Sequence, residues 1–229
     1  MNDSQHLSSQ FEAELSRLRS SVLQMGGLVE NPLAAAIDSS SSGEVGVVKQ
    51  IVETDRVIND IEKAIDDDCA HLIAKRQPTA SDLRMVFGVS KLVTDLERAG
   101  DEAKKIGKGV RRIYEAGQMP SQYGIGIRHL AEAALEMLRQ ALDCFARLDV
   151  DQAHRVIIAD NDVDVEFKSI VRQLITHMME DPRTITTSID IIAIARAIER
   201  IGDHAKNVAE QVVFIVEGRD IRHPKGSAE

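Results

Sequence analysis

The chain has 229 residues and a formal net charge of −9, because 37 Asp and Glu residues outnumber 28 Lys and Arg residues. This length suits one large domain or two small ones. The acidic balance argues against a nucleic-acid surface built on clustered positive charge. Aromatic residues, at 3% of the chain, are also too few for the stacking surfaces of single-stranded nucleic-acid binders. We therefore expect no nucleic-acid partner.

The cysteines and the N-terminal segment indicate the cellular compartment. Cys69 and Cys144 lie at apolar helical positions and do not form a C-x-x-C pair, which favours reduced core residues. The polar start, Met1 to Ser4, lacks the basic-then-apolar pattern of a signal peptide. The longest apolar stretches are far shorter than a membrane span. These features predict a cytoplasmic protein.

Apolar residues recur at helical spacing along almost the whole chain, and no segment alternates as a strand would. The pattern predicts six helices. The signals that bend, begin or end them are, in chain order, Pro32, the capping-box segment Ser41 to Glu44, Gln77-Pro78-Thr79, Gly117 with Pro120, the turn Asp149 to Gln152, and Asp181-Pro182. Long helices joined by short turns pack antiparallel.

An internal repeat divides the six helices into two sets of three. The segment Leu96 to Lys104 aligns with Ile198 to Lys206, 102 residues later, and Glu, Arg, Gly, Asp, Ala and Lys coincide. Further upstream, the segment beginning at Asp55 matches the one beginning at Asp160. We therefore predict an all-α fold of two pseudo-symmetric antiparallel three-helix bundles. The expected boundaries are 1–117 for the first bundle, 118–217 for the second and 218–229 for a charged, frayed tail.

Acidic side chains stand beside the apolar seams of this repeat. Asp55 and Asp160 occupy seam positions that a bundle normally gives to Leu or Ile. On the third and sixth helices, two acids lie four residues apart on one helix face: Glu97 with Asp101, and Glu199 with Asp203. Like charges at this spacing repel each other, and more strongly when desolvated. A positive group should therefore lie between them.

Two kinds of positive group fit the spacing. A metal ion held only by carboxylates would be a hard ion such as Mg²⁺, Mn²⁺ or Fe³⁺ rather than structural zinc. A ladder of salt bridges would serve equally well. In the first copy, Lys104 and Arg98 could neutralise Asp101. In the second copy, the ladder would run along one helix through Arg196, Glu199, Asp203 and Lys206. Spacing alone leaves both alternatives open.

The sequence offers little support for an enzyme. No Glu is followed three residues later by His, which removes the ferritin-like di-iron site. Gly107-Lys108-Gly109 lacks the spacing and the preceding strand of a phosphate-binding loop. His204 adjoins Asp203 and could be a ligand in the second copy, but its counterpart in the first copy is Glu102, and we interpret it as a solvated surface group. The alternative function that remains is a hydrolase-type metalloenzyme whose paired metals activate water.

The repeated Glu-Arg-x-Gly-Asp segments resemble the Glu/Asp-x-x-x-Asp signature of the PhoU family of phosphate-signalling regulators. Met25 to Glu30, Arg76 to Arg84 and the order of the two helical triplets extend the resemblance over nearly the whole chain. The resemblance implies two three-helix bundles with multinuclear metal sites on their acidic faces. It gives the ligand role by motif position to Glu97, Asp101, Glu199 and Asp203, with Asp55, Asp160 and Asp164 as additions from the neighbouring helices.

The two implied metal sites differ in one residue. Asn59 stands where the second copy has Asp164, which removes one negative charge from the first cluster. The resemblance leaves the identity of the metal open between iron, zinc and a magnesium- or manganese-type ion.

The resemblance also implies a role without a reaction. Such a protein restrains phosphate-starvation signalling when phosphate is plentiful, as an adaptor between the ATPase subunit of the phosphate ABC transporter and a phosphate-sensing histidine kinase. We therefore expect a cytoplasmic negative regulator that is not an enzyme, is a homodimer, and reaches the membrane only through its partners.

Overall fold

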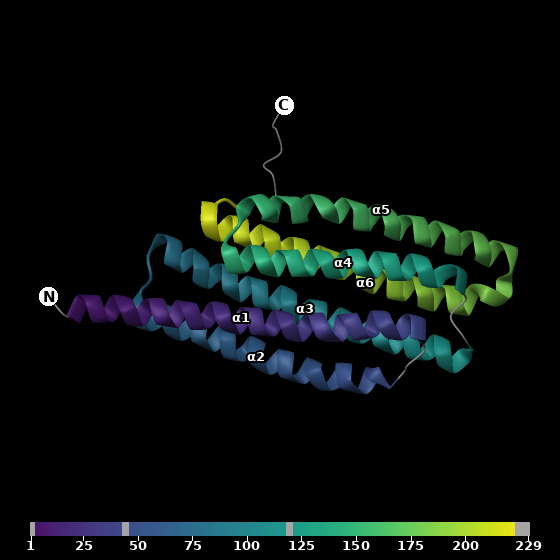
Figure 1. Ribbon diagram of the computed structural model, residues 1–229, viewed down its shortest axis with the longest axis horizontal. Helices are drawn as coiled ribbons and strands as arrows, with labels where there is room; N and C mark the ends of the chain where they lie inside the picture. The colour runs from purple at the N-terminus through teal and green to yellow at the C-terminus, as the bar shows by residue number, and fades with distance from the viewer. Residues whose placement is uncertain (1–2, 43–45, 118–120, 223–229) are drawn as a thin grey trace, which may run out of the picture.

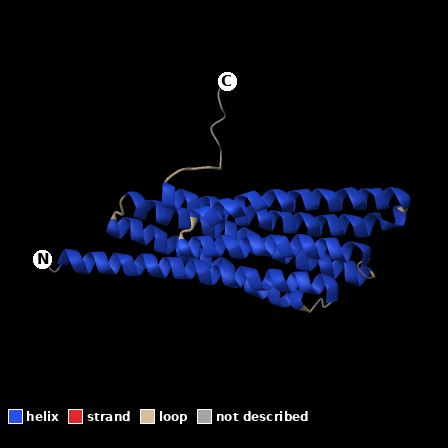
Figure 2. Cartoon of the chain, turned by 45° about the horizontal axis from the view of Figure 1, so that its top comes forward, coloured by secondary structure: helices blue, strands red, loops and turns tan. Residues whose placement is uncertain are grey.

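The computed structural model describes residues 3–42, 46–117 and 121–222, and these residues form long helices (Figure 1). No strand occurs within these ranges (Figure 2). No helix in the described ranges has the length and apolar character needed to cross a membrane. The elements are α1 (Asp3–Ser42), α2 (Val47–Arg76), α3 (Ala80–Ala116), α4 (Ser121–Arg147), α5 (Val150–Glu180), the 3₁₀ helix η1 (Pro182–Thr184) and α6 (Ile185–Glu217).

The helices form two bundles that lie side by side with their long axes roughly aligned (Figure 1). Helices α1, α2 and α3 pack together, as do α4, α5 and α6, and the two bundles meet where α3 packs on α6 and α1 on α4. Helices α2 and α5 occupy the two outer edges (Figure 1). The predicted all-α fold of two three-helix bundles is confirmed.

One apolar core runs through both bundles. Glycines bring the bundles close together, since a Cβ on Gly88 would lie 2.4 Å from Cγ1 of Ile215, and one on Gly109 would lie 2.7 Å from Cγ1 of Ile194. The α3–α6 contact therefore depends on the absence of side chains at two positions of α3. Burial of this shared core is the main favourable term in holding the bundles together.

The sequence predicts that Pro32 bends or ends the first helix. Pro32 does not end it, because α1 continues through Pro32 to Ser42. Proline removes one backbone hydrogen bond and crowds the preceding turn. Buried Val29 and Leu33 on either side, followed by buried Ile37, hold both parts of the helix against the core. Tertiary packing thus outweighs the local preference.

Parts of the predicted boundaries fall on residues outside the described ranges. Gly46 precedes α2 without a side-chain capping bond, and the predicted capping box falls partly on residues 43–45, outside the described residues. Residues 223–229 of the predicted tail also lie outside. The limits 1–117 and 118–217 stay predictions, with α3 ending at Ala116 and α4 beginning at Ser121.

Candidate acidic clusters

The first acidic cluster is centred on a lysine between α2 and α3. The ammonium of Lys104 lies 2.7 Å from Oδ2 of Asp55 and 2.7 Å from Oδ1 of Asp101. Asp55 is buried on the seam of α2, as the sequence predicts. One cation therefore neutralises an acid from each helix.

Two further carboxylates extend this first cluster. Burial raises the pKa of Glu97, and the negative charges of Asp101, Glu62 and Asp55 raise it further. Burial likewise raises the pKa of Glu62, with an added contribution from Asp66, while a hydrogen bond from Thr94 opposes the shift. The carboxylates of the cluster are thus close enough to repel one another, which is the condition that the spacing predicts.

The second cluster repeats the central ion pair between α5 and α6. The ammonium of Lys206 lies 2.8 Å from Oδ2 of buried Asp160. Lys206 and Asp160 are the repeat counterparts of Lys104 and Asp55. Burial raises the pKa of Asp203, and the charges of Asp160 and Asp164 add to the shift.

The packing beside the lysines repeats as well. A Cβ on Gly100 would lie 3.3 Å from Ile58, and one on Gly202 would lie 3.3 Å from Val163. These glycines let the paired helices approach closely beside the acids. The two-fold relation therefore extends from the backbone to individual side-chain contacts.

Glu199 lies at the edge of the second cluster and is buried. Its Oε1 accepts a hydrogen bond from Nη1 of Arg196 at 3.0 Å, and the guanidinium of Arg196 lies 4.4 Å from the ring centroid of Phe167. Burial raises the pKa of Glu199 although Arg196 lowers it. Asp164 pairs with Lys168, four residues later on α5, at 3.0 Å.

The salt-bridge alternative is realised in part. Lys104 pairs with Asp101, and Arg196 pairs with Glu199. The predicted step from Lys206 to Asp203 is replaced by the pair between Lys206 and Asp160 across the two helices. Within the described ranges, no group of three or more His, Cys, Asp or Glu side chains lies close enough to hold a metal ion.

Each cluster nevertheless retains one buried oxygen atom without a hydrogen-bond partner. These atoms are Oδ1 of Asn59 in the first cluster and Oε2 of Glu199 in the second. A buried polar oxygen without a partner is costly. Lys104 and Lys206 supply the positive charge at the two clusters.

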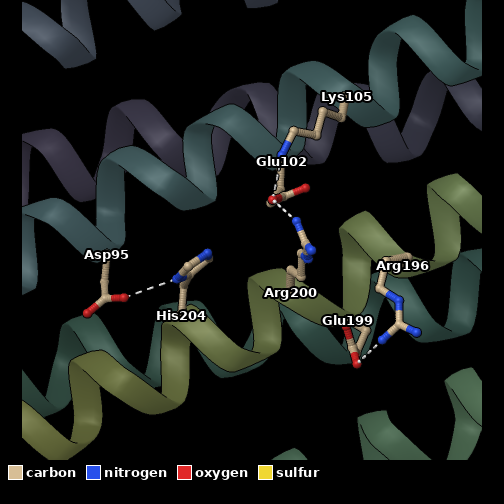
Figure 3. Close-up of polar contacts among 7 residues, drawn as sticks. All are labelled: Asp95, Glu102, Lys105, Arg196, Glu199, Arg200 and His204. Carbon is tan, nitrogen blue, oxygen red and sulfur yellow. Dashed lines mark hydrogen bonds and ion pairs between the residues drawn. The ribbon is translucent and has the colours of Figure 1, made fainter.

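A polar seam between α3 and α6 links the two bundles (Figure 3). Buried Asp95 accepts from Nδ2 of Asn207 at 2.9 Å and lies 3.0 Å from Nδ1 of His204. Buried Glu102 accepts from Lys105 at 2.8 Å and from Arg200 at 3.4 Å. The interpretation of His204 as a solvated surface group is wrong, because only 14% of its side chain is exposed.

The seam opens into a groove of about 500 Å³ that Asp101 lines from α3 and Asp203 from α6. Both clusters therefore border the same groove. No sequence pattern marks Asp95, whose counterpart in the repeat is Ala197, and only a weak one marks Glu102, whose counterpart is His204.

The fold and the clusters together define a class, an all-helical protein of two related bundles with one carboxylate cluster on each. The PhoU domain model matches residues 22–110 and again residues 127–212. The chain belongs to the PhoU family, whose members are non-enzymatic accessory and regulatory proteins of phosphate-specific transport. The family resemblance and the prediction that the chain is not an enzyme are confirmed.

Relatives of known name cover almost the whole chain. The phosphate-specific transport system accessory protein PhoU homolog of Pseudomonas aeruginosa is 45% identical over 218 residues, which are 95% of this chain and 90% of the relative. The accessory protein PhoU of Escherichia coli K12 is 42% identical over 226 residues, 99% of this chain and 93% of the relative.

Solved structures agree with this assignment. The crystal structure of PhoU from P. aeruginosa superposes with a TM-score of 0.88 at 44% identity and covers 91% of this chain and 100% of that one. The phosphate transport system regulatory protein PhoU from Streptococcus pneumoniae gives a TM-score of 0.85 at 27% identity, with 93% and 100% covered.

Proposed function

We propose that this chain is a cytoplasmic negative regulator of the phosphate-starvation response. The observation that carries the proposal is the match, over 95% or more of this chain, to proteins named as accessory to phosphate-specific transport. In this proposal the chain acts as an adaptor between the ATPase subunit of a phosphate ABC transporter and a phosphate-sensing histidine kinase. Long helices suit such a role, because helix-in-groove contacts need shape and charge but no catalytic group.

A reporter of the starvation response tests the regulatory role. Secreted alkaline phosphatase is measured in a deletion strain grown in excess phosphate, with the wild-type gene returned on a plasmid. We expect high output in the deletion strain and low output after complementation. Low output in the deletion strain would contradict the proposal.

The adaptor role has its own test. The tagged chain is purified from cells that express the ATPase subunit or the kinase, at high and at low phosphate. Co-purification of both partners supports an adaptor. Restoration of normal reporter output by a chain that captures neither partner would show that the regulation takes another route.

The proposal extends to the two acidic clusters as metal sites. Asp55, Glu97 and Asp101 would hold one site, and Asp160, Asp164, Glu199 and Asp203 the other, with iron, zinc or a magnesium- or manganese-type ion. What supports this is the raised pKa of Glu97, Glu199 and Asp203 and the unpartnered oxygen in each cluster. A bound ion would supply fixed positive charge that neutralises the carboxylates and joins the two helices.

Thermal unfolding gives a direct test of this part. Protein dialysed against a chelator is titrated with Mg²⁺, Mn²⁺, Zn²⁺ and Fe³⁺ in turn, and ligand binding to the native state should raise Tm with concentration. The variant Glu97→Ala/Asp101→Ala/Glu199→Ala/Asp203→Ala serves as the control. An equal rise in Tm in the wild type and the variant would place the ions elsewhere.

A further inference from the structure

The junction of α3 and α6 holds a second, cationic groove toward the C-terminal end of α3. The groove has a volume of about 330 Å³ and a floor of small residues that includes Gly109, Ala193 and Ala197. Five cationic side chains line it: Lys105, Lys108 and Arg112 from α3, and Arg196 and Arg200 from α6. Among the residues that the structure describes, its lining contains a single acid, Glu102. Positive charge is therefore concentrated here on a chain whose formal net charge is −9.

Acidic partners neutralise only part of the charge in this cationic groove. Oε1 of Glu102 accepts from Lys105 at 2.8 Å and from Arg200 at 3.4 Å, so two cations share one carboxylate (Figure 3). Lys108 is exposed and forms no ion pair within the described ranges. Arg112 and Arg196 each pair with an acid of their own. Two positive charges in the cationic groove thus remain without a counter-charge.

The internal repeat shows that the packing of α3 on α6 does not require these cations. The positions 102 residues away from the five cations carry Asn207, Glu210, Phe214, Thr94 and Arg98. One of these counterparts is a cation and one is an acid. Lys91, the counterpart of Ala193, lies with its ammonium 5.6 Å from the ring centroid of Phe214. The same two helices therefore pack at the other end of the junction without a row of five cations.

Two glycines fix the position of Lys108. A Cβ on Gly107 would lie 3.1 Å from Cδ1 of Ile51 on α2, and one on Gly109 would lie 2.7 Å from Cγ1 of Ile194 on α6. On either side of Lys108, α3 thus packs closely on a neighbouring helix. The segment lacks the spacing of a phosphate-binding loop, but it presents a cation to the groove from a helix face.

Charge and size favour one class of ligand. Lysine and arginine bind phosphate groups, and the guanidinium group can do so through two parallel hydrogen bonds. From Lys105 to Arg112, the cations of α3 extend over roughly 10 Å, which is more than a single phosphate ion spans. An extended polyanion would meet Asp101 and Asp203 in the adjoining groove at one end and Asp190 beside Arg112 at the other. A compact ligand with two or three phosphates fits both limits.

We infer that the cationic groove binds a compact polyphosphate group, either as inorganic pyrophosphate or triphosphate or as the phosphate chain of a nucleotide. Lys105, Lys108 and Arg200 contact the phosphate oxygens. Buried Glu102 holds two of these cations in place between α3 and α6. The small residues of the floor offer a surface for a nucleotide base. The inference uses the charge and shape of the groove and does not rest on the proposed regulatory function.

Isothermal titration calorimetry of the full chain tests the inference. The protein is treated with a chelator, dialysed free of it, and titrated at low ionic strength with pyrophosphate, tripolyphosphate, ATP and inorganic phosphate. We expect saturable one-to-one binding of the first two, and binding of inorganic phosphate that is at least tenfold weaker. Binding of ATP that is tighter than that of tripolyphosphate would identify a nucleotide as the ligand, and otherwise the ligand is inorganic polyphosphate.

Two variants locate the site without removing a partner that the fold requires. Lys108→Glu breaks no ion pair of the described residues and should raise the dissociation constant for tripolyphosphate at least tenfold. Arg200→Gln leaves Glu102 paired with Lys105 and should also weaken binding. The matched control is Lys63→Glu on α2, where the side chain is 75% exposed. It changes the net charge by the same amount as Lys108→Glu and should leave the constant unchanged. Circular dichroism establishes that each variant is folded.

Absence of saturable binding of pyrophosphate and tripolyphosphate to the wild type at millimolar concentrations overturns the inference. Equal weakening by Lys108→Glu and Lys63→Glu also overturns it, because overall charge rather than the groove would then control binding. Binding of hexaglutamate in place of the polyphosphates would overturn it in favour of an acidic protein segment. A chain that binds no polyphosphate but lowers the starvation reporter would leave the regulatory proposal standing, so the two can fail separately.

Discussion

The two acidic clusters occupy equivalent places in the two bundles but neutralise their charges differently. In the first cluster, Lys104 bridges Asp55 and Asp101. In the second, Lys206 pairs with Asp160, and Arg196 supplies a second cation to Glu199. The repeat thus preserves the helix pair, the seam acid and the lysine, while the remaining counter-charge differs between the halves.

Two exchanged residues account for the difference. Glu62 in the first bundle corresponds to Phe167 in the second, and Thr94 corresponds to Arg196. The aromatic ring provides a platform for the guanidinium, which can then reach Glu199. Glu62 adds a carboxylate to the first cluster, but Asn59 in place of Asp164 removes one, so the two clusters hold equal numbers of acids. Without the guanidinium, the first cluster has one fewer cation, and we expect it to depend more on an added positive ion.

The glycine contacts beside the two clusters are equivalent, so substituting either glycine should destabilise the protein to the same extent. Gly100→Val and Gly202→Val each place a side chain where a Cβ already lies 3.3 Å from the facing helix. We expect each to reduce the free energy of unfolding by about 1–3 kcal/mol through overpacking, measured by urea denaturation.

Gly27 is the control for these substitutions, because nothing lies within 4 Å of a Cβ there. Gly27→Val should be neutral or mildly stabilising. A large cost at one glycine of the pair and none at the other would contradict the equivalence of the two helix contacts.

The two buried seam acids, Asp160 and Asp55, should differ in the stability that the protein loses when each is replaced by alanine. Asp160→Ala leaves Lys206 without its ion-pair partner, and we expect a cost of about 2 kcal/mol. Asp55→Ala should cost about 1 kcal/mol, because Lys104 retains Asp101 at 2.7 Å. Chemical denaturation at low and moderate salt measures both, and equal costs would show that Asp101 gives Lys104 no compensation.

Substitutions at the repeat counterparts Thr94 and Arg196 test whether the second cluster depends on its extra cation. Arg196→Thr removes the ion pair with Glu199 and the contact with Phe167, and we expect a loss of about 1 kcal/mol. Thr94→Arg in the first bundle should recover less, because Glu62 stands where the second bundle has the aromatic ring. A double-mutant cycle between Arg196 and Phe167 measures their coupling free energy. A coupling near zero would show that the Phe167 ring does not stabilise the guanidinium.

The smallest expected effect is a pH dependence. Since the pKa of Glu97 is raised in the folded protein, the native state binds its proton more tightly than the unfolded state does. Its contribution is most favourable below the ordinary value of 4.5 and is lost as pH rises through the higher, folded pKa. Glu97→Gln should therefore stabilise metal-free protein at pH 7, by less than about 1 kcal/mol.

Thermal unfolding in the presence of a chelator follows this difference across the acidic range. The gap between Glu97→Gln and the wild type should close as pH falls toward 4.5. A gap that widens instead would mean that the ionised carboxylate is stabilised by the fold.

Periodicity and the repeat were sufficient to predict the fold, because core positions on helices follow the spacing of apolar residues. Asp55 and Asp160 were identifiable for the same reason, because an acid on a seam breaks an otherwise apolar pattern. Glu97, Asp101 and their counterparts were identifiable from the repeat and from their spacing of four residues. Pro32 was misjudged because a local rule cannot weigh the buried residues on either side of it.

The ion-pair partner of Lys206 could not be predicted from the sequence for a different reason. Spacing along one helix favoured Asp203, whereas the choice of Asp160 depends on how closely α5 approaches α6 at Gly202. Asp95 was missed because its role lies in a contact between bundles, and its repeat counterpart, Ala197, gives no pattern to recognise.

We propose that each bundle holds one cation site of its own. The most direct measurement is elemental analysis of metal bound to the purified chain and to the variants Glu97→Ala/Asp101→Ala and Glu199→Ala/Asp203→Ala. The account predicts that metal copurifies with the wild type, that each variant loses the share held by its own bundle, and that the combined variant holds none. A wild-type protein free of metal after growth and purification in metal-supplemented medium would contradict it and leave Lys104 and Lys206 as the permanent counter-charges.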